Sequence, residues 1–253
     1  MTIGIVIPAR LDSKRLPGKV LKDFLGMPMI EHVWRRAQLT NPLLESVIAT
    51  DSIEIKKIAE KFGANCILTS NDHKNGLSRV GEIADVLKWD HYLVLQADEI
   101  LIEPESLNLL ARITLSNSKF QFFNLITKLE NVGEIDDVNI VKCLTRKDNP
   151  IITMVRKSNS IALQLEQMEY TNKICGVYSC SSHLLKRLVD SAAQKIESSE
   201  SIEQMRVIEI GYNILGVPIG INHPSVNTLR EAEAVLKILN IDSKQQKIMN
   251  LYK

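Results

Sequence analysis

Short apolar runs alternate with amphipathic stretches through the first 118 residues, and this alternation limits the chain to a few folds. The runs "IGIVIPA" (3–9), "SVIAT" (46–50), "ANCILT" (64–69) and "HYLVLQA" (91–97) have the length of buried strands. Between them, residues 26–39, 51–63 and 77–88 carry apolar side chains at helical spacing, and we expect Asp51 to cap the second of these helices. The pattern predicts an α/β fold with a mostly parallel, Rossmann-like sheet and helices on both faces.

The second half of the chain has a different rhythm. Residues 120–129, 137–144, 150–156 and 174–180 have the composition of strands, with little helix between them before the helical stretch 182–196. We therefore expect one domain over 1–253, in which a first α/β half (1–118) is followed by an inserted smaller, more antiparallel lobe (about 119–225). Helices are expected again over 226–253.

Composition excludes several functional classes. The chain has 31 basic and 30 acidic residues and only 5% aromatic residues, so we expect no nucleic-acid partner. No apolar run approaches the roughly 18 residues of a membrane span, and the N-terminus has the pattern of a strand, so we expect a cytoplasmic protein without a membrane partner. The four cysteines lack C-x-x-C spacing and are expected to be reduced thiols.

A basic loop follows the first predicted strand. Within "IPARLDSKRLPGK" (7–19), four cations occur in ten residues: Arg10, Lys14, Arg15 and Lys19. Backbone amides that leave a strand, together with Arg and Lys side chains, make a cradle for phosphate. The alternative interpretation is a solvated basic loop without a ligand.

Two further polar stretches follow predicted parallel strands, "TSNDHKNGLSR" (69–79) and "QADE" (96–99). Ligands in such sheets bind beyond the carboxyl ends of the strands, so these stretches should converge with the basic loop. Asp98 would there face a phosphate site, where a carboxylate can hold Mg²⁺. Acidic residues after strands are common, however, and alone this signal is weak.

The chain resembles the CMP-Kdo synthetases, or 3-deoxy-manno-octulosonate cytidylyltransferases. "IPARLDSKRLPGKVL" is similar to the family's IPAR-x-x-S-x-RLPGK-x-L, and "GMPMIEHV" to its G-x-PMI-x-HV. "TSNDHKNGLSR" resembles T-x-x-DH-x-S-G-T-E-R, and "LQADE" resembles V-Q-G-D-E-P. "CGVYS" and "IEQMRVIEIG" resemble G-I-Y-x-Y and L-E-Q-L-R-x-L-x-x-G, so the resemblance runs in order over most of the chain.

The resemblance implies a role for each matching residue. CTP would be bound in the first half of the chain by Pro8, Ala9, Arg10, Ser13, Lys14, Arg15, Lys19, His73, Gly76 and Arg79. The sugar would be bound mainly in the inserted lobe, which would also form the dimer interface, by Gln96, Arg156, Tyr178, Glu203 and Gln204. Arg10, Lys19 and Asp98 would be catalytic, and the Mg²⁺ ligands would be Asp98 and Asn227.

The sequence departs from the family at several of these motifs. Asn227 stands where the family's V-D-T-P-E-D motif has its second metal-binding carboxylate, so Mg²⁺ affinity should fall unless another acid substitutes; Glu231 and Glu233 are nearby in the sequence. In the stretch "QADEI" (96–100), which we call the acidic turn, Ala97 and Ile100 replace the family's Gly and Pro. Ile174 replaces a His before G-I-Y-x-Y. Leu77 and Ser78 replace the family's Thr and Glu, and no Pro-Trp follows Arg156.

The resemblance therefore implies a Mg²⁺-dependent nucleotidyltransferase. It would transfer CMP from CTP to a Kdo-like 2-keto-3-deoxy sugar acid, release pyrophosphate, and act as a homodimer in lipopolysaccharide biosynthesis. Two alternatives stay open: a cytidylyltransferase for another acidic sugar (amino-Kdo or a nonulosonate), and a nucleotide-binding paralogue with weakened catalysis. A glycosyltransferase is disfavoured because "QADE" is not a D-x-D metal motif.

Overall fold

The computed structural model describes residues 1–13, 15–73, 75–158 and 160–252. Its strands are β1 (Ile3–Ala9), β2 (Asp23–Phe24), β3 (Met27–Pro28), β4 (Ser46–Thr50), β5 (Asn65–Leu68), β6 (His91–Leu95), β7 (Phe122–Lys128), β8 (Lys142–Thr145), β9 (Pro150–Val155), β10 (Thr171–Ser181) and β11 (Ile214–Pro218). Its α-helices are α1 (Met29–Gln38), α2 (Ile53–Lys61), α3 (Gly76–Leu87), α4 (Pro104–Ser116), α5 (Gly133–Asp136), α6 (Gln164–Tyr170), α7 (Ser182–Asp190), α8 (Lys195–Glu200), α9 (Met205–Glu209), α10 (Leu229–Ile241) and α11 (Ser243–Asn250). A short 3-10 helix, η1, spans Lys19–Leu21.

The centre of the molecule is a nine-stranded sheet in the order β5-β4-β1-β6-β10-β7-β11-β9-β8. Strands β5, β4, β1 and β6 pair in parallel, as the sequence of the first half predicted. Strand β10 is antiparallel to both β6 and β7, while β7 and β11 pair in parallel. The predicted α/β class and the antiparallel strands of the second half are confirmed, and these strands extend the main sheet.

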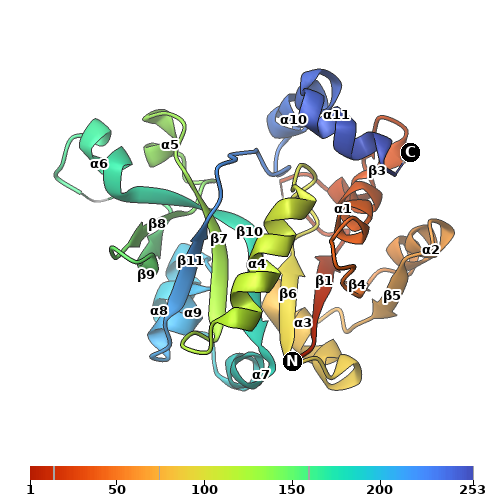
Figure 1. Ribbon diagram of the computed structural model, residues 1–253, viewed down its shortest axis with the longest axis horizontal. Coiled ribbons are helices and arrows are strands. Elements are labelled where there is room, and N and C mark those ends of the chain that lie inside the picture. Colours follow the sequence, from red (N-terminus) through yellow and green to blue (C-terminus); the bar gives the residue numbers. More distant parts are fainter. Residues whose placement is uncertain (14, 74, 159, 253) are drawn as a thin grey trace.

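Helices cover both faces of the sheet. In β1, Ile5 and Ile7 face a core that α1, α4 and α10 complete, whereas Val6 faces the core under α3 and α7. Figure 1 shows α4 and α1 in front of the sheet, and α5 and α6 near β8 and β9 at its far end. The alternation in β1 explains why a continuous apolar run is needed there: both faces are buried.

Helix α2 begins differently from our expectation. Ser52 is its N-cap and accepts a hydrogen bond from Ile55 N at 3.2 Å. Asp51, the predicted cap, instead pairs with the buried guanidinium of Arg79 at 2.7 Å. Because the Asp51 carboxylate is engaged in this ion pair, the Ser52 hydroxyl caps the helix instead.

Two other features bear on the sequence predictions. All four cysteines are free, as expected, with Cys66, Cys143 and Cys180 buried. Within the described part of the chain, no helix is both long and apolar enough to cross a membrane.

Candidate active site

The basic loop leaves β1 at the carboxyl end of the parallel strands and ends at Lys19, the first residue of η1. The Lys19 ammonium donates to Asp98 Oδ2 at 2.7 Å, so the segments that follow β1 and β6 meet through this pair. It also donates to Val226 O at 2.9 Å and to Asn227 Oδ1 at 3.0 Å. The convergence of the basic loop with the acidic turn, which topology predicted, is therefore present.

Arg15 extends the same cluster. Its guanidinium donates from Nη1 to Asn139 Oδ1 at 2.7 Å and from Nη2 to Asn227 Oδ1 at 2.9 Å. The side chain is exposed and spans the two halves of the chain. Arg10 is exposed just beyond β1, where its charge is open to a ligand, and Lys14 lies outside the described residues.

Asn227 lies on a segment, residues 219–228, that we call the strap. The strap follows β11 and runs to the first turn of α10. Glu231 accepts from Asn227 N at 2.8 Å and from Thr228 N at 2.7 Å, and Thr228 Oγ1 accepts from Glu231 N at 3.3 Å. This capping box holds the Glu231 carboxylate at the helix start, so Glu231 does not replace the missing carboxylate of position 227.

The oxygen atoms around Lys19 suit a magnesium ion. Asp98 Oδ1 is buried and accepts no hydrogen bond from the described residues, so one carboxylate oxygen is available for a ligand. Asn227 Oδ1 and Val226 O accept from the same ammonium group as Asp98 does. One carboxylate with neutral oxygens and phosphate is a common environment for Mg²⁺. Nowhere in the described ranges, this site included, do three or more His, Cys, Asp or Glu side chains form a group that could hold a metal ion.

The loop of residues 69–79, which the family resemblance predicts to contact CTP, is held to neighbouring segments by charged side chains. Arg79 is only 3% exposed and donates to Asp51 and Thr69. His73 contacts the Glu82 carboxylate, which also accepts from Ser70 N. Both side chains thus hold the loop together in this structure, and their contacts with CTP stay predictions.

Glu203 joins the loop region to β10. Its carboxylate accepts from Leu77 N, in the first turn of α3, at 3.2 Å and from Tyr178 OH at 3.0 Å. A Cβ added at Gly76 would lie 3.3 Å from Pro8 Cγ and 3.7 Å from Glu203 Oε1, so these residues form one closely packed corner. Burial raises the pKa of Glu203, although the two donors oppose this shift. Burial and the nearby Glu203 charge also raise the pKa of Tyr178.

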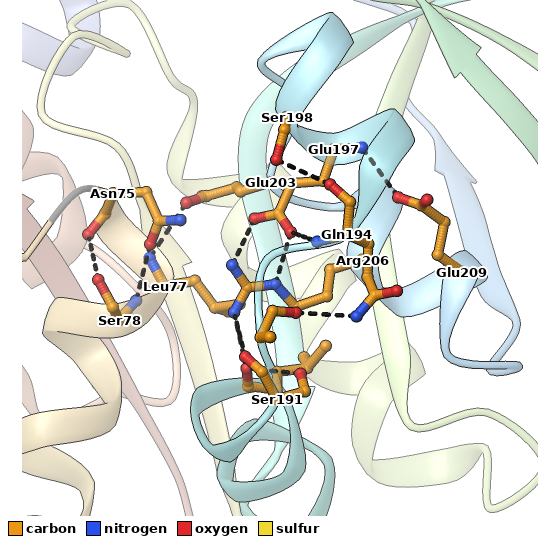
Figure 2. A network of polar contacts seen from close by, with 12 residues as sticks. Asn75, Leu77, Ser78, Ser191, Gln194, Glu197, Ser198, Glu203, Arg206 and Glu209 are labelled. Carbon is orange, nitrogen blue, oxygen red and sulfur yellow. Dashed lines mark hydrogen bonds and ion pairs between the residues drawn. The ribbon is translucent and has the colours of Figure 1, made fainter.

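A buried ion pair lies close to Glu203, as Figure 2 shows. Arg206 binds both carboxylate oxygens of Glu197, at 2.7 and 2.6 Å, and donates to Leu188 O at 2.8 Å. Glu209 accepts from Glu197 N at 2.8 Å. These bonds join helices α7, α8 and α9.

The remaining predicted sugar-binding residues are less concentrated. Gln204 is buried and donates weakly to Asn124 Oδ1 at 3.5 Å. Arg156 is occupied by three backbone carbonyls, those of Val138, Glu200 and Ser201. Their sugar contacts, like those of Gln96, stay predictions.

Sequence reasoning missed several residues of this region. Asn139, Glu197 and Arg206 support the predicted residues but carried no role in our sequence interpretation. Glu99 and Ser225 also went unassigned, although Glu99 stands in the motif "QADE". The capping pattern T-x-x-E at Thr228 is the one local signal that would have shown how Glu231 is used.

Comparison with known proteins agrees with this geometry. Residues 4–214 match the family described as cytidylyltransferase. The chain belongs to this family. A relative from Chlorobium limicola, named 3-deoxy-manno-octulosonate cytidylyltransferase, is 34% identical over 241 residues, which cover 94% of this chain and 98% of the relative. A relative of the same name from Francisella tularensis subsp. holarctica is 35% identical over 249 residues, which cover 94% of this chain and 99% of the relative.

The fold of this cytidylyltransferase also matches a solved structure. A CMP:2-keto-3-deoxy-manno-octonic acid synthetase, determined in complex with CTP, matches with a TM-score of 0.88 and 29% identity. The match covers 95% of this chain and 99% of the other. The family resemblance predicted from the motifs is confirmed.

Proposed function

We propose that this cytidylyltransferase transfers CMP from CTP to 3-deoxy-manno-octulosonate and releases pyrophosphate. One structural observation supports the proposal most: the basic loop meets the acidic turn through the ion pair of Lys19 with Asp98. The relatives described above are named 3-deoxy-manno-octulosonate cytidylyltransferase. A cationic loop facing a carboxylate at a sheet edge suits a nucleoside triphosphate with its metal.

This reaction depends mainly on positioning the reactants and on neutralising charge, and it needs no covalent intermediate with the protein. A hydroxyl oxygen of the sugar acid forms a bond to the α-phosphorus of CTP, and its proton passes to solvent. The bond between the α-phosphorus and the oxygen that bridges it to the β-phosphorus breaks, and pyrophosphate leaves. Arg10, Arg15 and Lys19 would neutralise the charge that accumulates on the phosphate oxygens during this step.

Asp98 and Asn227 would hold a Mg²⁺ ion beside the triphosphate. When bound, the ion would supply further neutralisation of the phosphate charge and would help to orient the leaving group. The Lys19 ammonium now lies between the two side chains, so nucleotide binding would draw it toward the phosphates. Asp98 Oδ1, which is buried and unpaired among the described residues, supports this assignment.

The acceptor would bind beside Tyr178 and Glu203, where β10 meets the start of α3. Ile174 in β10 favours a second candidate acceptor, because it offers no polar group where the family has a His. Amino-Kdo or a nonulosonic acid would be that candidate. The homodimer, the cytoplasmic location and the role in lipopolysaccharide biosynthesis also remain predictions from the family resemblance.

A pyrophosphate-release assay tests the proposal. The protein is incubated with each of CTP, ATP, GTP and UTP, with Mg²⁺ and with Kdo, amino-Kdo or a nonulosonic acid. We expect release with CTP and Kdo and little with the other nucleotides. Release with another acid sugar alone would favour the second candidate, and no release despite CTP binding would favour the paralogue with weakened catalysis.

A further inference from the structure

Glu99 connects three segments that surround the candidate site. It directly follows Asp98 and is only 8% exposed. Its Oε1 atom accepts from Gly176 N, in β10, at 2.8 Å and from Ser225 Oγ, in the strap, at 2.7 Å. One carboxylate oxygen thus joins the acidic turn to β10 and to the strap.

The chain is shaped to admit this carboxylate. The pairing of β10 with β7 shifts register between Ile174 and Tyr178, and Gly176 lies within that irregularity. A Cβ at Gly176 would lie 2.6 Å from Glu99 Oε1 and 2.9 Å from Gln96 Oε1, so only glycine fits without displacing them. Gly176 O also accepts from Gln96 N at 2.9 Å, which fixes the turn against β10.

The strap is fastened to the acidic turn at two neighbouring points. Besides the bond from Ser225 to Glu99, Val226 N donates to Asp98 O at 3.0 Å. The next residue is Asn227, whose side-chain oxygen accepts hydrogen bonds from Lys19 and Arg15. The position of the strap therefore sets where Asn227 and Val226 O lie relative to the Asp98 carboxylate.

We infer that Glu99 and Ser225 are positioning residues for nucleotidyl transfer, which hold the strap so that Asn227 and Asp98 face each other across Lys19. This inference rests on the proposed function for its effect on turnover. The burial of Glu99 makes the bond important, because a carboxylate out of water depends on its few donors.

Ser225→Ala is the informative variant, because it removes the hydroxyl and leaves Glu99 and the backbone in place. We expect a roughly tenfold fall in kcat, the effect of losing a hydrogen bond to a charged group. KM for CTP should change little, since the base and most phosphate contacts lie on other segments. Ser225→Thr, which restores the hydroxyl, should recover most of the lost kcat.

A control variant lies near the amino ends of β1 and β6, which Thr2 and Asp90 directly precede. Thr2 Oγ1 donates to the Asp90 carboxylate at 3.3 Å and accepts from Asp90 N at 3.0 Å, so Thr2→Val removes a hydroxyl–carboxylate bond together with one backbone contact. We expect it to leave kcat unchanged. Glu99→Ala and the double variant Glu99→Ala/Ser225→Ala complete a cycle, in which the second change should add little because both residues share one bond.

Hydrogen–deuterium exchange of the wild-type and Ser225→Ala proteins gives a readout that does not depend on turnover. Faster exchange at Val226–Thr228 in Ser225→Ala, with an unchanged rate in α3, supports the inference together with the kcat loss. Wild-type kcat in Ser225→Ala overturns it, whatever the melting temperature, and so does unchanged exchange in the strap. A wild-type protein that turns over no acceptor would overturn the proposed function, and the exchange comparison would still decide whether Ser225 holds the strap.

Discussion

Replacing Asn227 with aspartate changes one atom type at the point where two cations meet. Asn227 Oδ1 now accepts from Lys19 Nζ at 3.0 Å and from Arg15 Nη2 at 2.9 Å. A carboxylate would turn both contacts into ion pairs, and each would gain about 1 kcal/mol over its neutral form. Repulsion from Asp98, which shares Lys19, and solvent screening at the exposed Arg15 would offset about half of this gain.

We therefore expect Asn227→Asp to stabilise the ligand-free protein by about 1 kcal/mol, which raises Tm by about 2–4 °C in a chain of this size. The larger effect should be on Mg²⁺. A second carboxylate makes the oxygen set more negative, so the Mg²⁺ concentration for half-maximal rate should fall roughly tenfold, equivalent to about 1.4 kcal/mol.

The assay is pyrophosphate release at saturating CTP and acceptor while Mg²⁺ is varied. Asn139→Asp is the matched control, because Asn139 Oδ1 accepts from Arg15 Nη1 at 2.7 Å and, within the described structure, bonds to neither Lys19 nor Asp98. It should alter Tm but leave the Mg²⁺ dependence unchanged. An identical Mg²⁺ dependence in wild type and Asn227→Asp, or an equal shift in Asn139→Asp, would refute the assignment of Asn227 as a metal ligand.

Three further predictions follow from single contacts. Arg15→Ala should weaken CTP binding roughly tenfold in calorimetry through lost phosphate contacts, and unchanged affinity would remove Arg15 from the phosphate cradle. Tyr178→Phe keeps the ring stacked on Phe122, whose centroid lies 5.0 Å from that of Tyr178, but loses the hydrogen bond to Glu203. KM for the acceptor should therefore rise about threefold to tenfold, while KM for CTP stays constant. An unaltered acceptor KM would count against a sugar site at Tyr178. Burial raises the folded-state pKa of Glu203 above its unfolded value, so wild-type stability should decline as pH rises from about 4.3 through the raised pKa, and Glu203→Gln should lack this decline in urea unfolding. Parallel stability curves for the two proteins would contradict the raised pKa.

Sequence periodicity predicted the first half of the fold well, because its buried strands are short continuous apolar runs and its helices each carry one apolar stripe. Helix α4 was not assigned, although Pro104 at its start and the apolar residues Leu107, Leu110 and Ala111 are ordinary helix signals. Local sequence patterns could not predict that the strands of both halves form one continuous sheet. It depends on β10, which pairs with β6 on one side and with β7 on the other.

The candidate site divides in the same way. Strand order is enough to predict that the basic loop and the acidic turn meet, since both leave the same edge of parallel strands. The particular partners are not local: Lys19 and Asn227 are 208 residues apart, and Glu99 and Ser225 are 126 apart. A buried carboxylate gives no sequence signal of which distant hydroxyl it accepts from, so these supports emerged only in three dimensions.

Direct observation of the product tests the central proposal most sharply. The protein is incubated with CTP, Mg²⁺ and Kdo, and the reaction is followed by phosphorus NMR. The proposed function predicts a new phosphodiester resonance from a CMP-sugar, formed together with one equivalent of pyrophosphate as the CTP signals decline. CTP signals that persist unchanged, in a sample where calorimetry shows CTP to be bound, would contradict it.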